Sequence, residues 1–134
     1  MKKQKFLSEK CMCDSGKAFE TCCSPYLQYL KIVPTAEALM RSRYTAYARH
    51  DVNYLLLTWH ISTRPNSIDF EESSSLQWFR LEVVKHYQDS VDVNKAVVEF
   101  IAFYKMNGRA YRLHETSFFY KQEDRWYYLE GDIH

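Results

Sequence analysis

Glycine, proline and long apolar runs are all scarce in this sequence. Only three glycines and three prolines occur among 134 residues, which leaves little room for a glycine-rich loop of the kind that binds phosphate groups. No stretch approaches the roughly 18 apolar residues of a membrane-spanning helix, and the opening MKKQKFLSEK lacks the apolar core of a signal peptide. We therefore expect a cytoplasmic protein without a transmembrane segment.

A marked excess of charge is also missing. Basic residues number 18 and acidic residues 17, for a formal net charge of +1. Proteins that hold nucleic acids without sequence preference carry a clear basic excess. The balance argues against that class, apart from a local basic contact by the lysines of residues 1–10. Apolar residues make up 46% of the chain and aromatic residues 16%, which is enough to predict a packed core.

Cysteine is absent outside one short stretch, CMCDSGKAFETCC at residues 11–23. Four thiolates at about 2.3 Å suit the tetrahedral preference of zinc. In a reducing compartment, clustered cysteines bind metal more often than they form disulfides. The spacing C-x-C-x8-C-C therefore predicts one zinc ion, with two disulfides, a redox-active thiol pair or buried structural cysteines as the alternatives. The expected ligands are Cys11, Cys13, Cys22 and Cys23.

The rest of the chain divides by its hydrophobic pattern. We expect a flexible basic lead at 1–10, a zinc knuckle at 11–24, a connector at 25–34 and an α+β domain at 35–134. Thr35 is a favourable N-cap for a helix, and Asp51 is a favourable N-cap for a second helix. A polar loop containing Pro65 follows at 61–75.

From residue 76 the apolar pattern changes to a period of two, which is typical of strands. Four strands are predicted, at 76–88, 95–106, 109–121 and 125–130. Asn107-Gly108 favours a two-residue type I′ hairpin turn, which would place Phe100 opposite Glu115. The helices are expected to cover the more apolar face, with the Glu115 carboxylate in its middle. The other face mixes Ile101 and Phe103 with charges and leaves a homodimer as an expectation.

Glu115 is the centre of a candidate pocket. A carboxylate on an apolar face has a raised pKa unless it is paired, and such groups serve as general acids or bases. Arg41 and Arg43 from the first helix, with Trp59 and His60 from the second, are the residues expected to face it. The alternative is a buried structural ion pair between Glu115 and one of the arginines.

Other chemistry finds little support in the sequence. No nucleophile–histidine–carboxylate arrangement and no HExxH motif occur. His86, His114 and His134 are each interpreted as isolated surface residues. Catalytic residues are therefore not assigned beyond the candidate pocket.

The cysteine segment resembles the SEC-C motif, C-P-C-G-S-G-K-x-[FY]-x-x-C-[CH], found at the carboxyl end of the SecA translocation ATPase and in many small bacterial proteins. Ser15, Gly16, Lys17 and Phe19 match that motif, as do all four cysteines. Met12 replaces the usual proline. Asp14 replaces the usual first glycine, a position where a residue tolerant of positive φ is expected.

EALMRSRYTAYARHDVNYLLLTWH and HETSFFYKQEDRWYYLEG resemble the YchJ-like family of bacterial proteins. The resemblance implies a SEC-C knuckle followed by a nuclear-transport-factor-2-like (cystatin-like) cone, in which helices pack on a curved antiparallel sheet of about four strands. Many members carry a second SEC-C motif at the carboxyl end, and this sequence lacks it.

The first hypothesis for the function is a zinc-binding, non-enzymatic adaptor. Its knuckle would contact a protein partner or the ribosome, as the similar motif of the translocation ATPase contacts its chaperone. The alternative is an enzyme or small-ligand binder that uses the pocket around Glu115.

Overall fold

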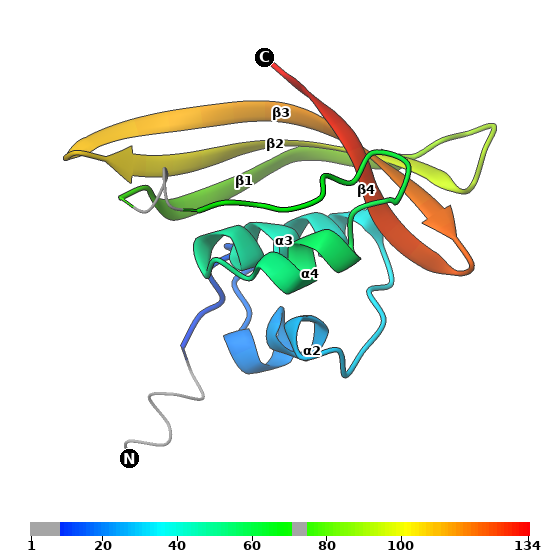
Figure 1. The fold of residues 1–134 in the computed structure, drawn as a ribbon, viewed down its shortest axis with the longest axis horizontal. Helices are drawn as coiled ribbons and strands as arrows, with labels where there is room; N and C mark the ends of the chain where they lie inside the picture. Colours follow the sequence, from blue (N-terminus) through cyan, green and yellow to red (C-terminus); the bar gives the residue numbers. More distant parts are fainter. Residues whose placement is uncertain (1–8, 71–74) are drawn as a thin grey trace.

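Four antiparallel strands form one curved sheet in the order β1-β2-β3-β4 (Figure 1). The computed structural model describes residues 9–70 and 75–134. Most of the expected basic lead and part of the expected loop lie outside these residues. The strands are β1 (Gln77–Gln88), β2 (Lys95–Met106), β3 (Arg109–Gln122) and β4 (Arg125–Ile133). The predicted α+β class with a four-stranded antiparallel sheet is confirmed.

The β2–β3 hairpin has the register that Asn107-Gly108 predicts. Asn107 has φ of 53° and Gly108 has φ of 78°, as a type I′ turn requires. Phe100 lies opposite Glu115. Register shifts in β1 and between Phe118 and Phe119 of β3 interrupt the regular pairing, and such bulges bend and twist a sheet.

Two helices, α3 (Ala36–Ala48) and α4 (Val52–Leu57), lie on one side of the sheet (Figure 1). Both begin at the expected caps. The Thr35 hydroxyl accepts a hydrogen bond from the Ala38 N–H at 3.0 Å, and the Asp51 carboxylate accepts one from the Tyr54 N–H at 3.1 Å. Each cap satisfies an N–H group that the helix itself leaves without a partner.

The segment before α3 contains a 3-10 turn, η1 (Phe19–Thr21), and a short helix, α2 (Ser24–Leu27). Pro25 lies in the first turn of α2, where its missing N–H costs nothing. Figure 1 shows α2 on the side of α3 and α4 that faces away from the sheet. The cysteine segment therefore lies against the helical layer.

One buried cluster joins the cysteine segment to the domain. Cysteine side chains belong to the same packed core as α3 and the inner face of the sheet. Its members include Cys11, Cys13, Cys23, Leu39, Met40, Tyr44, Val98, Phe100, Ala102 and Phe119. The knuckle is thus packed into the core and is not a separate appendage.

The outer face of the sheet carries Ile101, Phe103 and Phe118 as half-buried side chains. A homodimer through this face stays a prediction. Among the described residues, none of the helices combines the length and the apolar character needed to cross a membrane.

Candidate metal centre and neighbouring cavity

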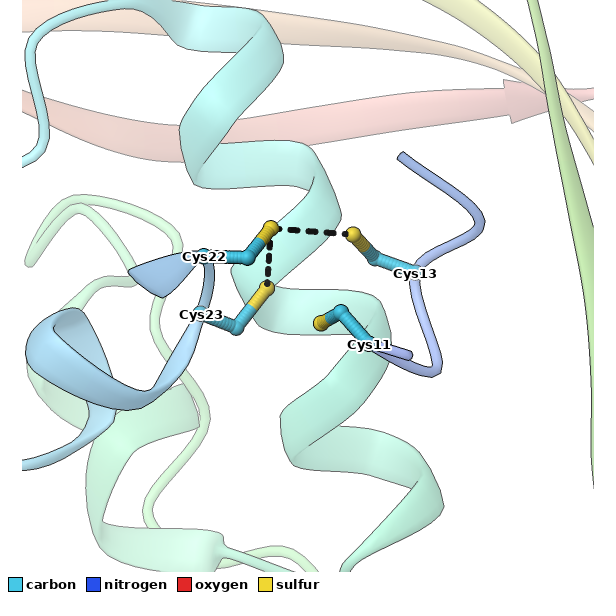
Figure 2. A group of neighbouring side chains, drawn as sticks. All are labelled: Cys11, Cys13, Cys22 and Cys23. Atoms are coloured by element: carbon cyan, nitrogen blue, oxygen red, sulfur yellow. Dashed lines mark hydrogen bonds between the residues drawn. The ribbon is translucent and has the colours of Figure 1, made fainter. Parts of the chain in front are cut away.

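The four cysteine sulfurs converge on one point beside α3 (Figure 2). Their Sγ atoms all lie within 4.8 Å of one another. The Sγ atom of Cys22 lies 3.6 Å from that of Cys13 and 4.0 Å from that of Cys23. A zinc ion with bonds of about 2.3 Å to four sulfurs gives a tetrahedron with edges of about 3.8 Å. None of the four cysteines forms a disulfide. The distances between their sulfurs therefore fit four thiolate ligands around one zinc ion.

Three of these thiols are almost completely buried. Cys11 is 4% exposed, Cys13 0% and Cys23 1%, whereas Cys22 is partly exposed. Without a cation the crowded thiols share hydrogen bonds. Those bonds lower the pKa of Cys11, and they raise the pKa of Cys13 to about 11 and that of Cys23 as well. Four thiolates can therefore coexist here only beside a compensating positive charge such as a bound metal ion.

The loop between the two cysteine pairs folds back on itself. The Cys11 N–H donates to the Lys17 carbonyl at 2.9 Å, and both Asp14 (φ 61°) and Gly16 (φ 86°) adopt positive φ. The expectation that the position of Asp14 needs positive φ is met. Its carboxylate also accepts a hydrogen bond at 2.9 Å from the Leu81 N–H on the edge strand β1. A glycine here could not make that contact.

Hydroxyl groups surround the sulfurs. The Thr45 hydroxyl on α3 donates to the Cys23 sulfur at 3.5 Å and lies 3.8 Å from the Cys11 sulfur. The Ser15 hydroxyl lies 3.1 Å from the Cys22 sulfur. Hydrogen bonds of this kind hold metal ligands in position and disperse the charge of thiolates.

Arg41 belongs to this centre and not to the Glu115 cavity. Its guanidinium donates to the Cys13 carbonyl at 2.7 Å and to the Glu37 carboxylate at 3.0 Å. The second oxygen of Glu37 lies 3.0 Å from the His86 ring nitrogen. Arg41 therefore joins the knuckle to α3 and does not line the cavity that holds Glu115.

A cavity of about 260 Å³ lies between α3 and the inner face of the sheet. Its walls are mainly apolar and aromatic side chains, among them Met40, Tyr44, Trp78, Phe100 and Phe119. Arg43, Tyr47, Glu115, Ser117 and Tyr128 supply its polar groups. Apolar walls with a few convergent polar groups are the usual composition of a small-ligand site.

Arg43 is buried at one end of the cavity, with 5% of its surface exposed. It donates to the Leu55 carbonyl at 2.8 Å and the Thr58 hydroxyl at 2.7 Å. The guanidinium carbon lies 4.6 Å from the ring centre of Tyr128 and 5.1 Å from that of Trp59. Burial lowers the pKa of Arg43, and the aromatic faces compensate part of the buried charge.

Glu115 projects into the cavity without an arginine partner. Its Oε2 atom accepts hydrogen bonds from the Ser117 hydroxyl and, at 3.5 Å, from the Tyr128 hydroxyl. Across residues 9–70 and 75–134 its carboxylate makes no ion pair. Gly131 on β4 leaves the room that Glu115 uses, because a Cβ atom at that position would collide with the carboxylate. The buried Glu115–arginine pair considered from the sequence is not formed.

Comparison with known proteins shows what the chain is related to. A family model described as YchJ, middle NTF2-like domain, matches residues 35–131. The chain belongs to the YchJ-like family. It is 44% identical over 133 residues to a UPF0225 protein of Chromobacterium violaceum, with 98% of each chain covered. It is 43% identical to a UPF0225 protein of Ralstonia nicotianae, covering 92% of this chain and 90% of the relative.

Solved structures agree with this membership. A SEC-C motif containing protein from Rhodopseudomonas palustris is 34% identical and superposes with a TM-score of 0.81, covering 91% of this chain and 96% of the other. Another from Psychrobacter arcticus is 26% identical, with a TM-score of 0.78 and coverages of 97% and 85%. The NTF2-like fold and the SEC-C resemblance inferred from the sequence are therefore shown for this YchJ-like chain.

Trp59 and His60 of this YchJ-like chain are not among the residues that line the cavity. The Trp59 ring packs edge-on against Tyr128 at 5.0 Å, behind the cavity wall. His60 lies 2.8 Å from the Gln122 amide oxygen and 2.7 Å from the Ser62 hydroxyl, and it does not line the cavity. Of the candidate residues, Glu115 and Arg43 both line the cavity. The Trp59 ring packs against the Arg43 guanidinium.

Tyr128, which lines the cavity, and Gly131, which makes room for Glu115, are residues that the sequence did not reveal. Both lie on β4, on either side of the register shift opposite Phe118 and Phe119. A shift of one residue exchanges the two faces of a strand. Strict alternation therefore could not tell which residues of β4 face the cavity in this YchJ-like chain.

Proposed function

We propose that this protein binds one zinc ion through its SEC-C cysteines and acts as a non-enzymatic adaptor. The observation that carries the zinc assignment is the sulfur geometry, with separations of 3.6 and 4.0 Å along two edges of the cluster. Four cysteine ligands leave no coordination position for water, which is the pattern of structural zinc sites. Such a zinc ion would stabilise the fold of the knuckle and would take no direct part in a reaction.

The adaptor role rests on what the knuckle exposes. Met12 is 41% exposed, and Lys10 and Lys17 on the same loop are exposed. An apolar side chain beside two lysines suits a protein partner with an acidic surface, and the phosphates of ribosomal RNA are the alternative partner. The proposal keeps the division into a knuckle at 11–24, a connector at 25–34 and an α+β domain at 35–134. It also places the protein in the cytoplasm, where thiols stay reduced.

Metal analysis tests the zinc assignment. Protein purified without chelator and under reducing conditions should contain one zinc per chain by elemental mass spectrometry. The Cys22→Ser/Cys23→Ser variant should lose it. Met12→Ala is the matched control, because it changes the same loop and leaves every sulfur in place. A full zinc content in the double variant, or no metal in the parent protein, would contradict the assignment.

Partner capture tests the adaptor role separately. Lys17→Glu and Met12→Glu change the exposed knuckle surface while the cysteines remain. We expect both variants to keep one zinc per chain and to lose an interaction that the parent protein shows in cross-linking from bacterial lysate. Partners that bind the variants and the parent equally would refute the knuckle as the docking surface.

A second candidate function is small-ligand binding or catalysis in the Glu115 cavity. The observation that favours it is a carboxylate without an arginine partner in a cavity of about 260 Å³. We expect ligands with an apolar body and one hydrogen-bond donor to raise the thermal midpoint of the parent protein and not that of Glu115→Gln. A screen in which every hit stabilises both proteins equally would remove this candidate.

A further inference from the structure

Glu99, His114 and His134 meet on the outer face of the sheet, away from the cysteines. Glu99 lies on β2 and His114 on β3, and His134 directly follows β4. Figure 1 shows that β4 ends on the side of the sheet opposite the helices. One ligand atom from each residue lies within 4.8 Å of those from the other two. His114 and His134 are therefore not the isolated surface residues that the sequence indicates.

The contacts within this group are close. The His114 Nε2 atom lies 2.7 Å from the Glu99 Oε2 atom. The rings of His114 and His134 stack with their centres 4.2 Å apart and their planes 22° apart. The His134 backbone N–H donates to the His114 carbonyl at 2.9 Å, and its Nε2 atom lies 2.7 Å from the Thr116 hydroxyl. Backbone and side chain together hold His134 beside the other two.

We propose that Glu99, His114 and His134 form a second metal site, for a divalent transition metal of the zinc class. Two imidazoles and one carboxylate are ligands that zinc, nickel and copper accept. Metal bonds of about 2.1 Å place neighbouring ligand atoms about 3.0–3.4 Å apart. The separation of 2.7 Å between the His114 and Glu99 ligand atoms is close to that range. The remaining coordination positions face solvent.

The surroundings of the site support a metal more than a simple ion pair. A histidine–carboxylate pair needs only Glu99 and His114, whereas His134 adds a third ligand. Thr116 holds the Nε2 atom of His134 and leaves Nδ1 as the ligand atom, as hydroxyl and carbonyl partners do around metal-bound histidines. Lys85 lies 3.9 Å from the other Glu99 oxygen. Its side chain is 63% exposed and can turn into solvent when a cation binds.

The test is a zinc titration of the full chain, made without a histidine tag and already carrying the metal it is purified with. We expect calorimetry to show one additional zinc per chain. Proton–nitrogen spectra should show the imidazole signals of His114 and His134 moving on zinc addition. His114→Gln and His134→Gln should each weaken that binding at least tenfold. If either histidine variant fails to fold, Glu99→Gln replaces it and should weaken zinc binding in the same way.

His86→Gln is the matched control, because His86 also lies beside a glutamate, Glu37, at 3.0 Å, and within residues 9–70 and 75–134 the two form no group with a third metal ligand. It should leave the affinity within about twofold of the parent. Equal weakening by His86→Gln and His134→Gln would overturn the proposal. So would imidazole signals that stay in place on zinc addition, or a Kd weaker than roughly 1 mM.

Discussion

The cysteine centre and the Glu115 cavity lie on two sides of the same helix, α3, and they treat buried polar groups differently. In the cysteine centre the sulfurs contact one another, and Arg41 and Thr45 hydrogen-bond to the knuckle. In the cavity Arg43 and Glu115 are both present without forming an ion pair with each other. The cysteine centre gathers four like side chains at one point, whereas the cavity holds an arginine and a glutamate that bond to other groups and not to each other.

The difference teaches where stability and binding capacity reside. Under the proposed zinc assignment, the bound cation contributes directly to the stability of the folded protein. A carboxylate kept apart from an arginine does not contribute the energy of a buried pair, and it remains available for hydrogen bonding. The first region should therefore respond to mutation as structure, and the second as a binding site.

Removal of zinc should have the largest effect on this comparison. Chelation under reducing conditions should lower the free energy of unfolding by on the order of 5 kcal/mol. That is less than the 10–16 kcal/mol typical of small zinc peptides, because the sheet keeps its own core. Hydrogen-exchange mass spectrometry should show lost protection in residues 9–24 and in α3, with β2 and β3 still protected. An equal loss of hydrogen-exchange protection in β2 and β3 would mean that the knuckle and the sheet unfold together.

Replacing Arg43, the positively charged side chain of the cavity, should have the second largest effect on stability. Arg43→Ala removes two hydrogen bonds and the contacts with three aromatic rings, and should destabilise the protein by about 3–5 kcal/mol in urea unfolding. Arg49→Ala is the matched control, since Arg49 is the exposed C-cap residue of α3 and covers the Phe19 ring at 4.9 Å. It should cost less than about 1 kcal/mol. Equal losses in the free energy of unfolding of both variants would contradict a structural role for Arg43.

The Asp14 position tests how the knuckle is attached to the sheet. Asp14→Ala places a methyl-bearing residue at φ of 61° and removes the bond to the Leu81 N–H, so it should cost about 2 kcal/mol. Asp14→Gly restores the usual SEC-C residue and removes only the hydrogen bond, for about 1 kcal/mol. Denaturant midpoints measure both. A larger loss with glycine than with alanine would show that positive φ is not the decisive factor.

The smallest expected effect distinguishes a binding site from a structural pair. Glu115→Gln keeps the shape of the side chain and the hydrogen bond from Ser117, so it should change the free energy of unfolding by less than about 1 kcal/mol. A broken buried ion pair would instead cost about 3–5 kcal/mol. Urea unfolding of the variant measures the difference, and a loss in the larger range would return Glu115 to a structural role.

Local signals in the sequence were sufficient for most of the fold. The Asn107-Gly108 pair specifies its turn by backbone sterics alone, and that turn fixes the register of β2 and β3. Thr35 and Asp51 cap their helices through contacts three residues away. Such interactions depend on neighbours in the chain, so they can be inferred without knowing the tertiary structure.

The cavity could be predicted only in part, because it depends on long-range geometry. Arg41 and Arg43 are two residues apart on one helix, and only the rotation of α3 against the sheet decides which of them faces Glu115. Tyr128 reaches the cavity through a register shift in the sheet, which has no signal in the pattern of β4. The pairing of His114 with His134 likewise needs the β3–β4 alignment.

Helix α3 has no exposed residue, since every position from Ala36 to Ala48 is buried or half-buried. A typical surface helix keeps one side free for solvent, and that side absorbs sequence change at little cost. Here one side serves the cysteines and the other serves the cavity. In a saturation mutagenesis scan, these thirteen positions should tolerate fewer substitutions than any strand of the sheet, whose outer face remains in water.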